Sequence, residues 1–525
     1  MPGENDRPFD RRKFLKATVG AGATGFVVVT APSFVKPVFA MVRSGRPSVT
    51  HGVQSGDVTD RSAVVWARAD RPARMLVELA ESPSFSGARS LQGPFTDESR
   101  DFTAQLRLHG LAGGRDVFYR VRFADRNDEA LTSEPVVGHF RSAPTSRRDV
   151  SFLWSGDTAG QGWGINPDAG GMRTYETMRQ LSPDLFIHSG DTIYADGPLA
   201  ETVALPDGGT WHNVVTLEKS KVAETLAEFR GNFRYNLLDH NVRRFNAEVP
   251  VLAQWDDHET ANNWYPGEIL DDPRYTVTDV DVLAARANQA FHEYFPVGET
   301  SQEPGRIYRR VSYGPSLDVF LIDLRTYRGP NTANDQARAS EVTEILGEAQ
   351  LAWLQQELRG SKATWKAIAS DLPIGLIVPD GPSQEGIAQG RPGALGRELE
   401  IARLLSSIKA DRVRNVVWFT ADVHYTAAHH YDPARATFSD FTPFWEFVSG
   451  PLNAGTFGPN TLDPTFGPEV RFQRAADRPN QPPTDGLQFF GHVVIDGRSQ
   501  VMTVRLMDVA GDVLHRVELE PEVSG

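Results

Sequence analysis

The spacing of hydrophobic positions changes along the chain and divides it into two regions. Between residues 41 and 145, short apolar runs such as 62–67 and 117–123 are separated by Gly, Asp and Ser turns, and the second run partly alternates with polar residues. This pattern is typical of half-buried strands. Between residues 146 and 525, apolar strand-like runs alternate with helical segments, as in layered α/β domains. The sequence therefore predicts a β-sandwich followed by an α/β domain.

The first 40 residues have a different pattern, which is that of an export signal. The paired arginines Arg11 and Arg12 precede an apolar stretch at 17–31, and the small residues at 38–40 suit cleavage. These features predict a twin-arginine signal peptide over residues 1–40 and the twin-arginine export machinery as a partner. The alternative is a membrane anchor, but the stretch is shorter than the ~20 apolar residues that a span requires. We expect no stable transmembrane segment, and a periplasmic, cell-wall-associated or extracellular location.

Charge and cysteine content narrow the range of possible functions. The formal net charge is −14, which argues against nucleic-acid binding as a primary role. The chain has no cysteine, so it forms no disulfide in spite of the predicted export. Because an acidic protein repels phosphate substrates, a phosphate-binding site on it would need bound cations.

Aspartates recur where the apolar runs of the second region end. Ligands of open α/β sheets bind at the carboxyl ends of the strands. Carboxylates that converge there repel one another and need cations or raised pKa values. A single aspartate in such a place is often only a turn or helix-cap residue. The aspartates in question are Asp157, Asp191, Asp256, Asp257, Asp323, Asp371 and Asp422.

The predicted ligands indicate the kind of metal. Carboxylates with few histidines favour hard cations such as Ca²⁺, Mg²⁺ and Fe³⁺, and thiolate ligation is excluded because cysteine is absent. Two metal ions that share a bridging carboxylate can hold a hydroxide for in-line attack on phosphorus. The sequence thus predicts a metal-dependent phosphoesterase.

Three short motifs carry a resemblance to a known family. The segment Gly190-Asp191-Thr192-Ile193-Tyr194 resembles the GDxxY motif of calcineurin-like metallophosphoesterases, which include the purple acid phosphatases. The segment Asp257-His258-Glu259 resembles their GNH[DE] motif with Asp for Asn, and Asp422-Val423-His424 resembles GHxH with Asp for the first His. With both replacements, the chain is similar to the PhoD-like alkaline phosphatases over nearly its whole length.

The resemblance implies a fold and a set of metal ligands. The fold is a fibronectin III-like β-sandwich followed by a four-layer α/β/β/α metallophosphoesterase domain. Asp191 would bridge the metal ions, Tyr194 and His424 would bind Fe³⁺, and Asp257 and Asp422 would hold one or two Ca²⁺ or another divalent metal. The family has a cysteine thiolate on the iron. Here the matching stretch contains Asp157, which we take as the replacement ligand, and this leaves the identity of the first metal open.

The resemblance also suggests roles in catalysis. His258 is a candidate general acid, with a structural histidine as the alternative. Arg325 and Arg328 are candidates for holding phosphate. Asn263, or its neighbour Asn262, is a candidate for a substrate or metal contact, although an Asn pair is as often a turn feature.

The expected activity is hydrolysis of phosphate monoesters by a metal-bound hydroxide, with diesters as further substrates. A phosphodiesterase or phospholipase D-like enzyme on the same site is the nearest alternative. The segments 198–248 and 263–282 are expected to shape the entrance and to decide between them. A non-enzymatic secreted calcium-binding adhesive protein is the alternative from another class.

Overall fold

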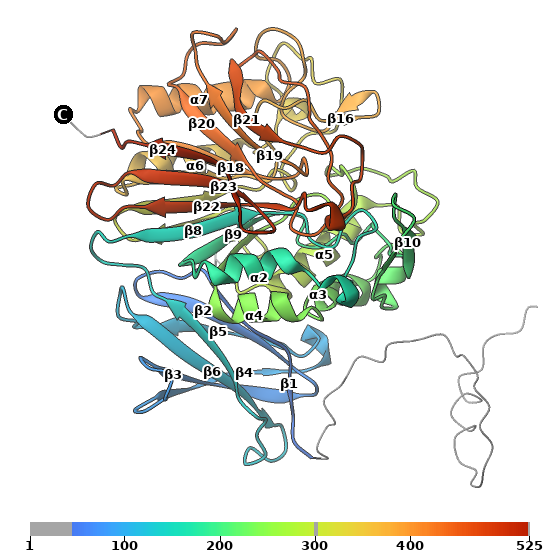
Figure 1. The fold of residues 1–525 in the computed structure, drawn as a ribbon, viewed down its shortest axis with the longest axis vertical. Helices are drawn as coiled ribbons and strands as arrows, with labels where there is room; N and C mark the ends of the chain where they lie inside the picture. Colours follow the sequence, from blue (N-terminus) through green and yellow to red (C-terminus); the bar gives the residue numbers. More distant parts are fainter. Residues whose placement is uncertain (1–44, 299–302, 523–525) are drawn as a thin grey trace, which may run out of the picture. The chain divides into compact units, whose positions relative to one another are not determined.

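The computed structural model describes residues 45–298 and 303–522. The predicted signal peptide at 1–40 lies outside the described residues. The described residues belong to one compact unit. Figure 1 shows its strands and helices coloured along the sequence. Among the described residues, none of the helices has the length and hydropathy that crossing a membrane requires.

The first part of the described chain is a sandwich of two antiparallel sheets. In β3 and β6, buried and half-buried residues alternate, so one face of this sheet packs inward. This confirms the predicted β-rich N-terminal domain. One sheet holds β1 (Val49–Gly56), β2 (Ser62–Ala69) and β5 (Thr103–His109), and the other holds β4 (Arg89–Thr96), β3 (Ala73–Ala80), β6 (Asp116–Asp125) and β7 (Val136–Arg141).

The larger α/β part contains two sheets. The first has the order β24-β23-β22-β8-β9-β12 and continues through β1 into the sandwich, where Gly56 pairs with Val251. Its strands are β8 (Val150–Ser155), β9 (Leu185–Ser189), β12 (Val251–Gln254), β22 (Phe489–Ile495), β23 (Met502–Asp508) and β24 (Val513–Leu519). The second sheet, in the order β13-β14-β15-β18-β20-β19-β21, consists of β13 (Arg309–Tyr313), β14 (Leu317–Leu321), β15 (Trp365–Ala369), β18 (Val416–Thr420), β20 (Phe444–Val448), β19 (Thr426–Tyr431) and β21 (Pro468–Arg474).

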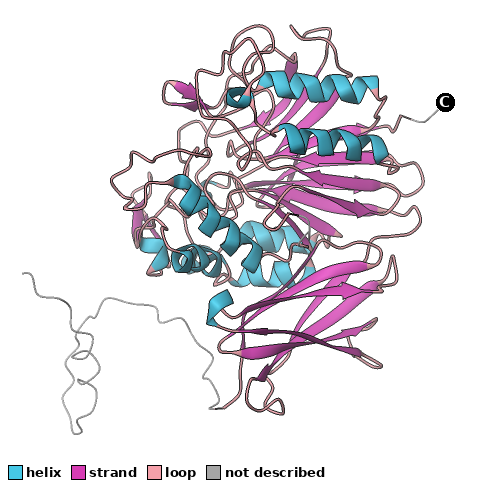
Figure 2. Cartoon of the chain, turned by 180° about the vertical axis from the view of Figure 1, so that it is seen from behind, coloured by secondary structure: helices cyan, strands magenta, loops and turns pink. Residues whose placement is uncertain are grey.

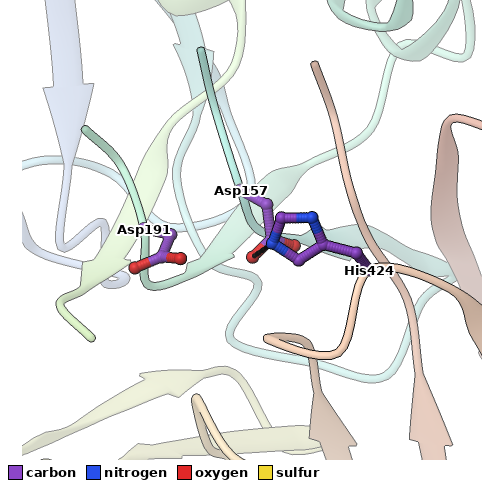
Figure 3. Close-up of side chains that lie close together, drawn as sticks. All are labelled: Asp157, Asp191 and His424. Carbon is purple, nitrogen blue, oxygen red and sulfur yellow. Dashed lines mark ion pairs between the residues drawn. The ribbon is translucent and has the colours of Figure 1, made fainter. Parts of the chain in front are cut away.

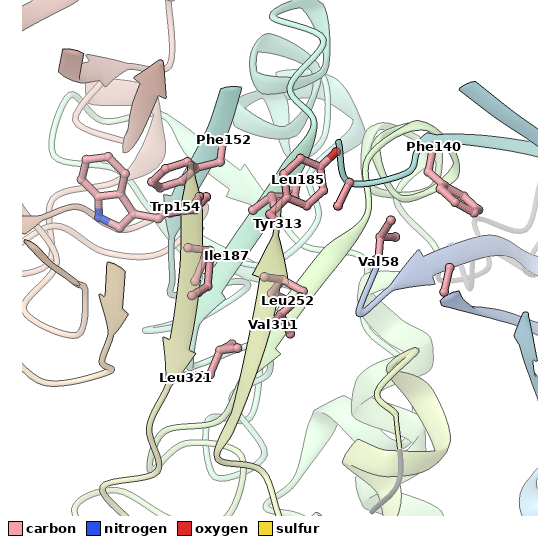
Figure 4. Packing of buried hydrophobic residues seen from close by; sticks show 14 of the residues in the cluster. Val58, Phe140, Phe152, Trp154, Leu185, Ile187, Leu252, Val311, Tyr313 and Leu321 are labelled. Carbon is pink, nitrogen blue, oxygen red and sulfur yellow. The ribbon is translucent and has the colours of Figure 1, made fainter. Parts of the chain in front are cut away.

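The two sheets pack face to face, and helices cover their outer faces. Apolar residues of β8, β9 and β12 meet those of β14, β15 and β18 in one buried cluster, part of which Figure 4 shows. The helices α2 (Arg173–Gln180), α3 (Leu226–Asn236), α4 (His240–Glu248) and α5 (Val280–Tyr294) pack on the first sheet. The helices α6 (Glu348–Gly360) and α7 (Glu398–Ala410) pack on the second. Figure 2 shows these layers from behind, and they confirm the predicted α/β/β/α arrangement.

Strand direction explains where functional side chains can gather. The strands β8, β9 and β12 run parallel, and so do β14, β15, β18 and β20. Most of these strands are buried along their whole length, as expected for parallel strands covered on both faces. Their carboxyl ends therefore carry the loops that are free to bind ligands.

Two short hairpins lie outside the main sheets. One joins β10 (Thr202–Ala204) to β11 (Thr210–His212), and the other joins β16 (Pro379–Asp380) to β17 (Ser383–Gln384). The second is labelled β16 in Figure 1. This hairpin lies after β15 in the chain, between Asp371 and Asp422, which both belong to the candidate site described below.

Candidate metal centre

Strand ends from both sheets bring the predicted ligands together. Asp157 follows β8, Asp191 follows β9, and Asp257 follows β12. From the second sheet, Asp422 and His424 follow β18. Asp157, Asp191, Asp257 and His424 are buried, and Asp422 is half-buried. The chain thus places residues that are far apart in sequence around one spot.

The first group, which we call the histidine cluster, consists of Asp157, Asp191, Tyr194 and His424. Ligand atoms of the two aspartates and the histidine all lie within 4.8 Å of one another, and Figure 3 shows the His424 ring against Asp157. His424 Nε2 is 3.3 Å from Asp157 Oδ1 and 2.8 Å from the Tyr194 hydroxyl. His424 Nδ1 donates to the Gly455 carbonyl at 2.5 Å, which leaves Nε2 as the atom available to a metal.

The second group, the arginine cluster, consists of Asp256, Asp257, Asp371 and Asp422 with Arg325. Ligand atoms of Asp256, Asp257 and Asp422 also lie within 4.8 Å of one another. The Arg325 guanidinium lies 2.5 Å from Asp256, 3.7 Å from Asp371 and 3.9 Å from Asp257. A further group of Asp191, Asp257 and His258 connects the two clusters.

Unpartnered carboxylate oxygens show that a cation fits this site. Among the described residues, both carboxylate oxygens of Asp157 and of Asp371, and Oδ2 of Asp256, are buried without a hydrogen-bond partner. Leaving a buried carboxylate unpaired costs several kcal/mol, roughly, unless it is protonated or bound to a cation. An oxygen-rich set of ligands with one imidazole and one phenol suits hard metal ions.

The pKa values of the carboxyl groups reflect the same crowding. Burial, reinforced by the neighbouring charges of Asp257 and Asp256, raises the pKa of Asp191 well above its ordinary value. Burial likewise raises the pKa of Asp422, and it raises that of Asp256 to about 6 although Arg325 opposes the shift. Burial acts in the same direction on Asp257, but the charges of His258 and Arg325 hold its pKa below the ordinary value. Bound cations would remove this cost of ionisation.

His258 is held by an aspartate that the sequence analysis missed. Its Nδ1 donates to Asp196, whose two carboxylate oxygens lie 2.8 and 2.9 Å away, and the Tyr194 ring stacks on its imidazole with centroids 4.2 Å apart. Burial lowers the pKa of His258, but Asp196 and Asp257 outweigh it and raise the pKa to about 10. Asp196 lies two residues after the tyrosine of the GDxxY-like motif, and that proximity was the only signal of its role.

The two arginines predicted to hold phosphate already contact carboxylates. Arg325 and Arg328 are buried, and both contact Glu385, at 2.5 and 3.2 Å. Arg325 Nε also donates to Asp256 at 2.6 Å. Direct contact of either arginine with substrate therefore stays a prediction. Glu385 was missed because it follows a strand of only two residues, which no periodicity or motif in the sequence marks.

The predicted contact residue Asn263 lies beside the arginine cluster. Its backbone N–H donates to Asp257 Oδ2 at 2.6 Å, and its side-chain amide donates to Asp380 at 3.1 Å. The neighbouring Asn262 has an exposed side chain, and its backbone N–H donates to Asp196. The structure thus brings Asn263 to the site and leaves the Asn262 side chain outside it.

One of the strand-end aspartates does not join either cluster. Asp323 accepts hydrogen bonds from the Trp255 indole and from the backbone of Arg325 and Thr326. It is therefore a capping residue of the loop after β14, as the alternative interpretation of any single strand-end aspartate allowed.

The backbone at the ligands is unusual. Asp157, Asp191, Asp422 and His424 all have positive φ, at 68°, 49°, 67° and 57°. Non-glycine residues rarely adopt this conformation, and they concentrate at functional sites when they do. Close packing adds a constraint, since a Cβ on Gly450 would lie 2.2 Å from Asp157 Oδ2.

Family models and a known relative match most of this chain. The family model for the PhoD-like phosphatase matches residues 152–506, and the model for the PhoD-like phosphatase N-terminal domain matches residues 36–144. Alkaline phosphatase D of Bacillus subtilis (strain 168) is 25% identical over 484 residues, which cover 86% of this chain and 77% of that protein.

Solved structures share the fold. A structure of PhoD aligns with a TM-score of 0.67 at 21% identity, covering 90% of this chain and 88% of that one. The purple acid phosphatase PPD1 from yellow lupin (Lupinus luteus) aligns with a TM-score of 0.59 at 11% identity, covering 90% of this chain and 74% of that one. With family models matching most of its length, this chain belongs to the PhoD-like phosphatases and is a phosphoric ester hydrolase.

Proposed function

We propose that this hydrolase is exported by the twin-arginine route and hydrolyses phosphate monoesters at a centre of Fe³⁺ and Ca²⁺. The histidine cluster would hold Fe³⁺, and Asp191, Asp257 and Asp422 would hold one or two Ca²⁺. The observation that carries the proposal is the Asp157 carboxylate. Both of its oxygens are buried without a hydrogen-bond partner within the described structure, and Oδ1 lies 3.3 Å from Nε2 of His424.

The chemistry of each cluster supports its metal. Burial raises the pKa of Tyr194 well above its ordinary value, so a strongly charged cation is required to displace the phenolic proton. That favours Fe³⁺ in the histidine cluster. Asp257 and Asp422 supply only oxygen, which suits Ca²⁺.

Residues around the centre would have separate roles in hydrolysis. Bound metal ions would neutralise the phosphoryl oxygens and activate water for in-line attack. His258 would give its Nε2 proton to the leaving oxygen, because Asp196 holds the ring by Nδ1 and the pKa of about 10 keeps it protonated at neutral pH. Arg325 would orient Asp256.

Phosphodiester hydrolysis, including a phospholipase D-like reaction, is the second candidate. A monoester dianion carries more charge than a diester and is best matched by free guanidinium groups. Arg325 and Arg328 already contact Asp256 and Glu385, which favours the less charged substrate. Membership of a phosphatase family removes the alternative of a non-enzymatic adhesive protein.

The test compares p-nitrophenyl phosphate with bis-p-nitrophenyl phosphate on metal-analysed protein, with and without added Ca²⁺. Calcium-dependent turnover that favours the monoester, with iron bound, is the expected result. Preference for the diester would replace the first candidate with the second, and turnover by iron-free and calcium-free protein would overturn the metal assignment.

A tyrosine variant tests the iron assignment separately. Tyr194→Phe is expected to abolish the visible tyrosinate-to-iron absorption while Ca²⁺ binding persists. Tyr265→Phe is the matched control, because it leaves every proposed ligand intact. Visible absorption that survives in Tyr194→Phe would show that Tyr194 does not bind iron.

Export is tested with residues 1–40 fused to a reporter protein. Replacing Arg11 and Arg12 together by Lys is expected to keep the reporter in the cytoplasm. Unchanged export of that variant would contradict the twin-arginine assignment.

A further inference from the structure

The hairpin of β16 and β17 is joined to the arginine cluster at both of its strands. Asp380 lies at the end of β16, and Glu385 directly follows β17. Within the described structure the hairpin pairs with no strand of the main sheets. Its backbone is held by the bond from the Gln384 N–H to the Thr332 carbonyl, 2.7 Å long, and by Arg397, which donates to the carbonyls of Gln384 and Glu385 at 2.9 and 2.8 Å. The side chains of Asp380 and Glu385 add further contacts at its two strand ends.

On the first strand, Asp380 binds two side-chain amides. Its Oδ1 accepts from Asn263 at 3.1 Å, and its Oδ2 accepts from Asn331 at 2.9 Å. The Asn331 amide also donates to the Asn263 carbonyl at 2.8 Å, so Asn263 is held from both sides. The backbone N–H of Asn263 then donates to Asp257 at 2.6 Å. Only one residue thus separates Asp380 from a proposed Ca²⁺ ligand.

On the second strand, Glu385 connects the hairpin to Asp256. Glu385 contacts Arg325 and Arg328 at 2.5 and 3.2 Å, and Arg325 donates to Asp256 at 2.6 Å. Arg328 also donates to the side-chain oxygen Oδ1 of Asn331, at 3.1 Å. The contacts therefore form a closed ring. It runs from Asp256 through Arg325 and Glu385 to the hairpin, and from Asp380 through Asn263 back to Asp257, the neighbour of Asp256.

We propose that Asp380 is a positioning residue for the second metal site. By fixing Asn263, it aims the Asn263 N–H at Asp257 and holds that carboxylate in the orientation that Ca²⁺ requires. Groups that orient metal ligands contribute to metal affinity although they never touch the ion. This inference rests on the proposed function, since it takes Asp257 as a Ca²⁺ ligand.

The backbone conformation of Asn263 allows a second variant that interrupts this ring of contacts. Its φ is 58°, a conformation that glycine adopts without strain. Asn263→Gly therefore removes the amide that binds Asp380 but keeps the backbone N–H that binds Asp257. If the ring acts as described, Asn263→Gly and Asp380→Ala interrupt the same link, and their effects on metal affinity are not additive.

The experiment titrates Ca²⁺ calorimetrically into full-length protein from which calcium alone has been removed. Asp380→Ala is expected to weaken Ca²⁺ binding by about 10- to 100-fold, and Asp380→Asn, which keeps one acceptor, by less. At saturating Ca²⁺ the kcat of both variants for p-nitrophenyl phosphate should return to the wild-type value. Asp207→Ala is the matched control, because Asp207 is an exposed aspartate in the other short hairpin, between β10 and β11.

Asp257→Asn separates failure of this inference from failure of the proposed function. Wild-type Ca²⁺ affinity in Asp380→Asn and Asn263→Gly, with affinity lost in Asp257→Asn, would overturn the role of Asp380 alone. Unchanged affinity in Asp257→Asn would overturn the ligand assignment itself. A lower melting temperature without a change in Ca²⁺ affinity would show that Asp380 only stabilises the fold.

Discussion

The two clusters of the candidate centre differ in how their buried negative charge is neutralised. In the arginine cluster, Arg325 contacts three of the four aspartates. In the histidine cluster, among the residues that the structure describes, neither Asp157 nor Asp191 forms an ion pair with a lysine or an arginine. The arginine cluster is thus partly neutralised by the chain itself, whereas the histidine cluster would need a bound metal ion for the same purpose. Four variants or conditions test this difference.

Replacing Asp191, the residue of the histidine cluster that lies next to Asp257 of the arginine cluster, should have the largest effect. Asp191→Asn is expected to lower kcat/KM for a phosphate ester by about 10³-fold or more, because it removes several kcal/mol of metal-assisted stabilisation of the transition state. The chelated variant should be more stable than the chelated wild type, because it lacks a buried carboxyl group with a strongly raised pKa. Steady-state kinetics and urea unfolding measure these effects. Full activity with unchanged metal content would mean that Asp191 does not bridge the clusters.

Removing the neutralising side chain should destabilise the arginine cluster. Arg325→Met leaves Asp256 buried without its cation and leaves Glu385 paired with Arg328 alone, so the free energy of unfolding of chelated protein is expected to fall by about 3–5 kcal/mol. Arg403→Met, which breaks an exposed pair with Glu348, should cost no more than about 1 kcal/mol. Equal losses in the two variants, measured by urea unfolding, would contradict the proposed difference between buried and exposed arginines.

Metal removal should make stability depend on pH. The folded-state pKa values of Asp191 and Asp422 are raised well above the ordinary 3.8, and that of Asp256 to about 6, so the folded chain binds these protons more tightly than the unfolded chain does. The contribution of these three groups to the free energy of unfolding of chelated protein should therefore be greatest below pH 3.8. It should be lost as pH rises through their folded-state pKa values.

Metal-loaded protein should not show this loss. Metal present at 100 times its dissociation constant adds about 2.7 kcal/mol to the free energy of unfolding. Urea unfolding between pH 5 and 8, with metal and with chelator, measures the difference, which should widen as pH rises. A constant difference over that range would show that these carboxyl groups do not account for it.

The smallest effect should appear in the pH profile of catalysis. If protonated His258 is the general acid, activity falls as pH rises through its pKa of about 10. Asp196→Asn removes a charge that raises this pKa, so the alkaline limb of kcat should move to lower pH by about one unit. Asp272→Asn, which changes an aspartate paired with Arg274, is the control. An alkaline limb that does not move in Asp196→Asn would assign it to another group.

The sequence predicted the parts of the site that follow regular strands. Apolar runs marked the ends of β8, β9, β12 and β18, and parallel strands must present those ends at one edge, so Asp157, Asp191, Asp257 and Asp422 could be grouped in advance. The same logic wrongly included Asp323, since a strand-end aspartate can equally cap its own loop. The fold followed from the same periodicity and from the family motifs.

Residues that reach the site from irregular loops were not predictable in the same way. Asp196, Asp380 and Glu385 lie in segments without periodicity, and each becomes significant only through a partner more than 50 positions away in the chain. A single sequence does not reveal such pairings. The buried arginines illustrate the same limit, because their residue type suggested phosphate binding while their surroundings supply carboxylates.

The positive φ angles of the ligands restrict how this site can evolve. At Asp157, Asp191 and Asp422, a mutation must satisfy the backbone as well as the metal, and asparagine and glycine tolerate this conformation best while β-branched residues tolerate it least. Accepted changes of ligand should therefore be drawn from a short list of residues, whatever the metal prefers. Asparagine is consequently the most suitable replacement for engineering these positions, because it changes the charge and leaves the loop geometry in place.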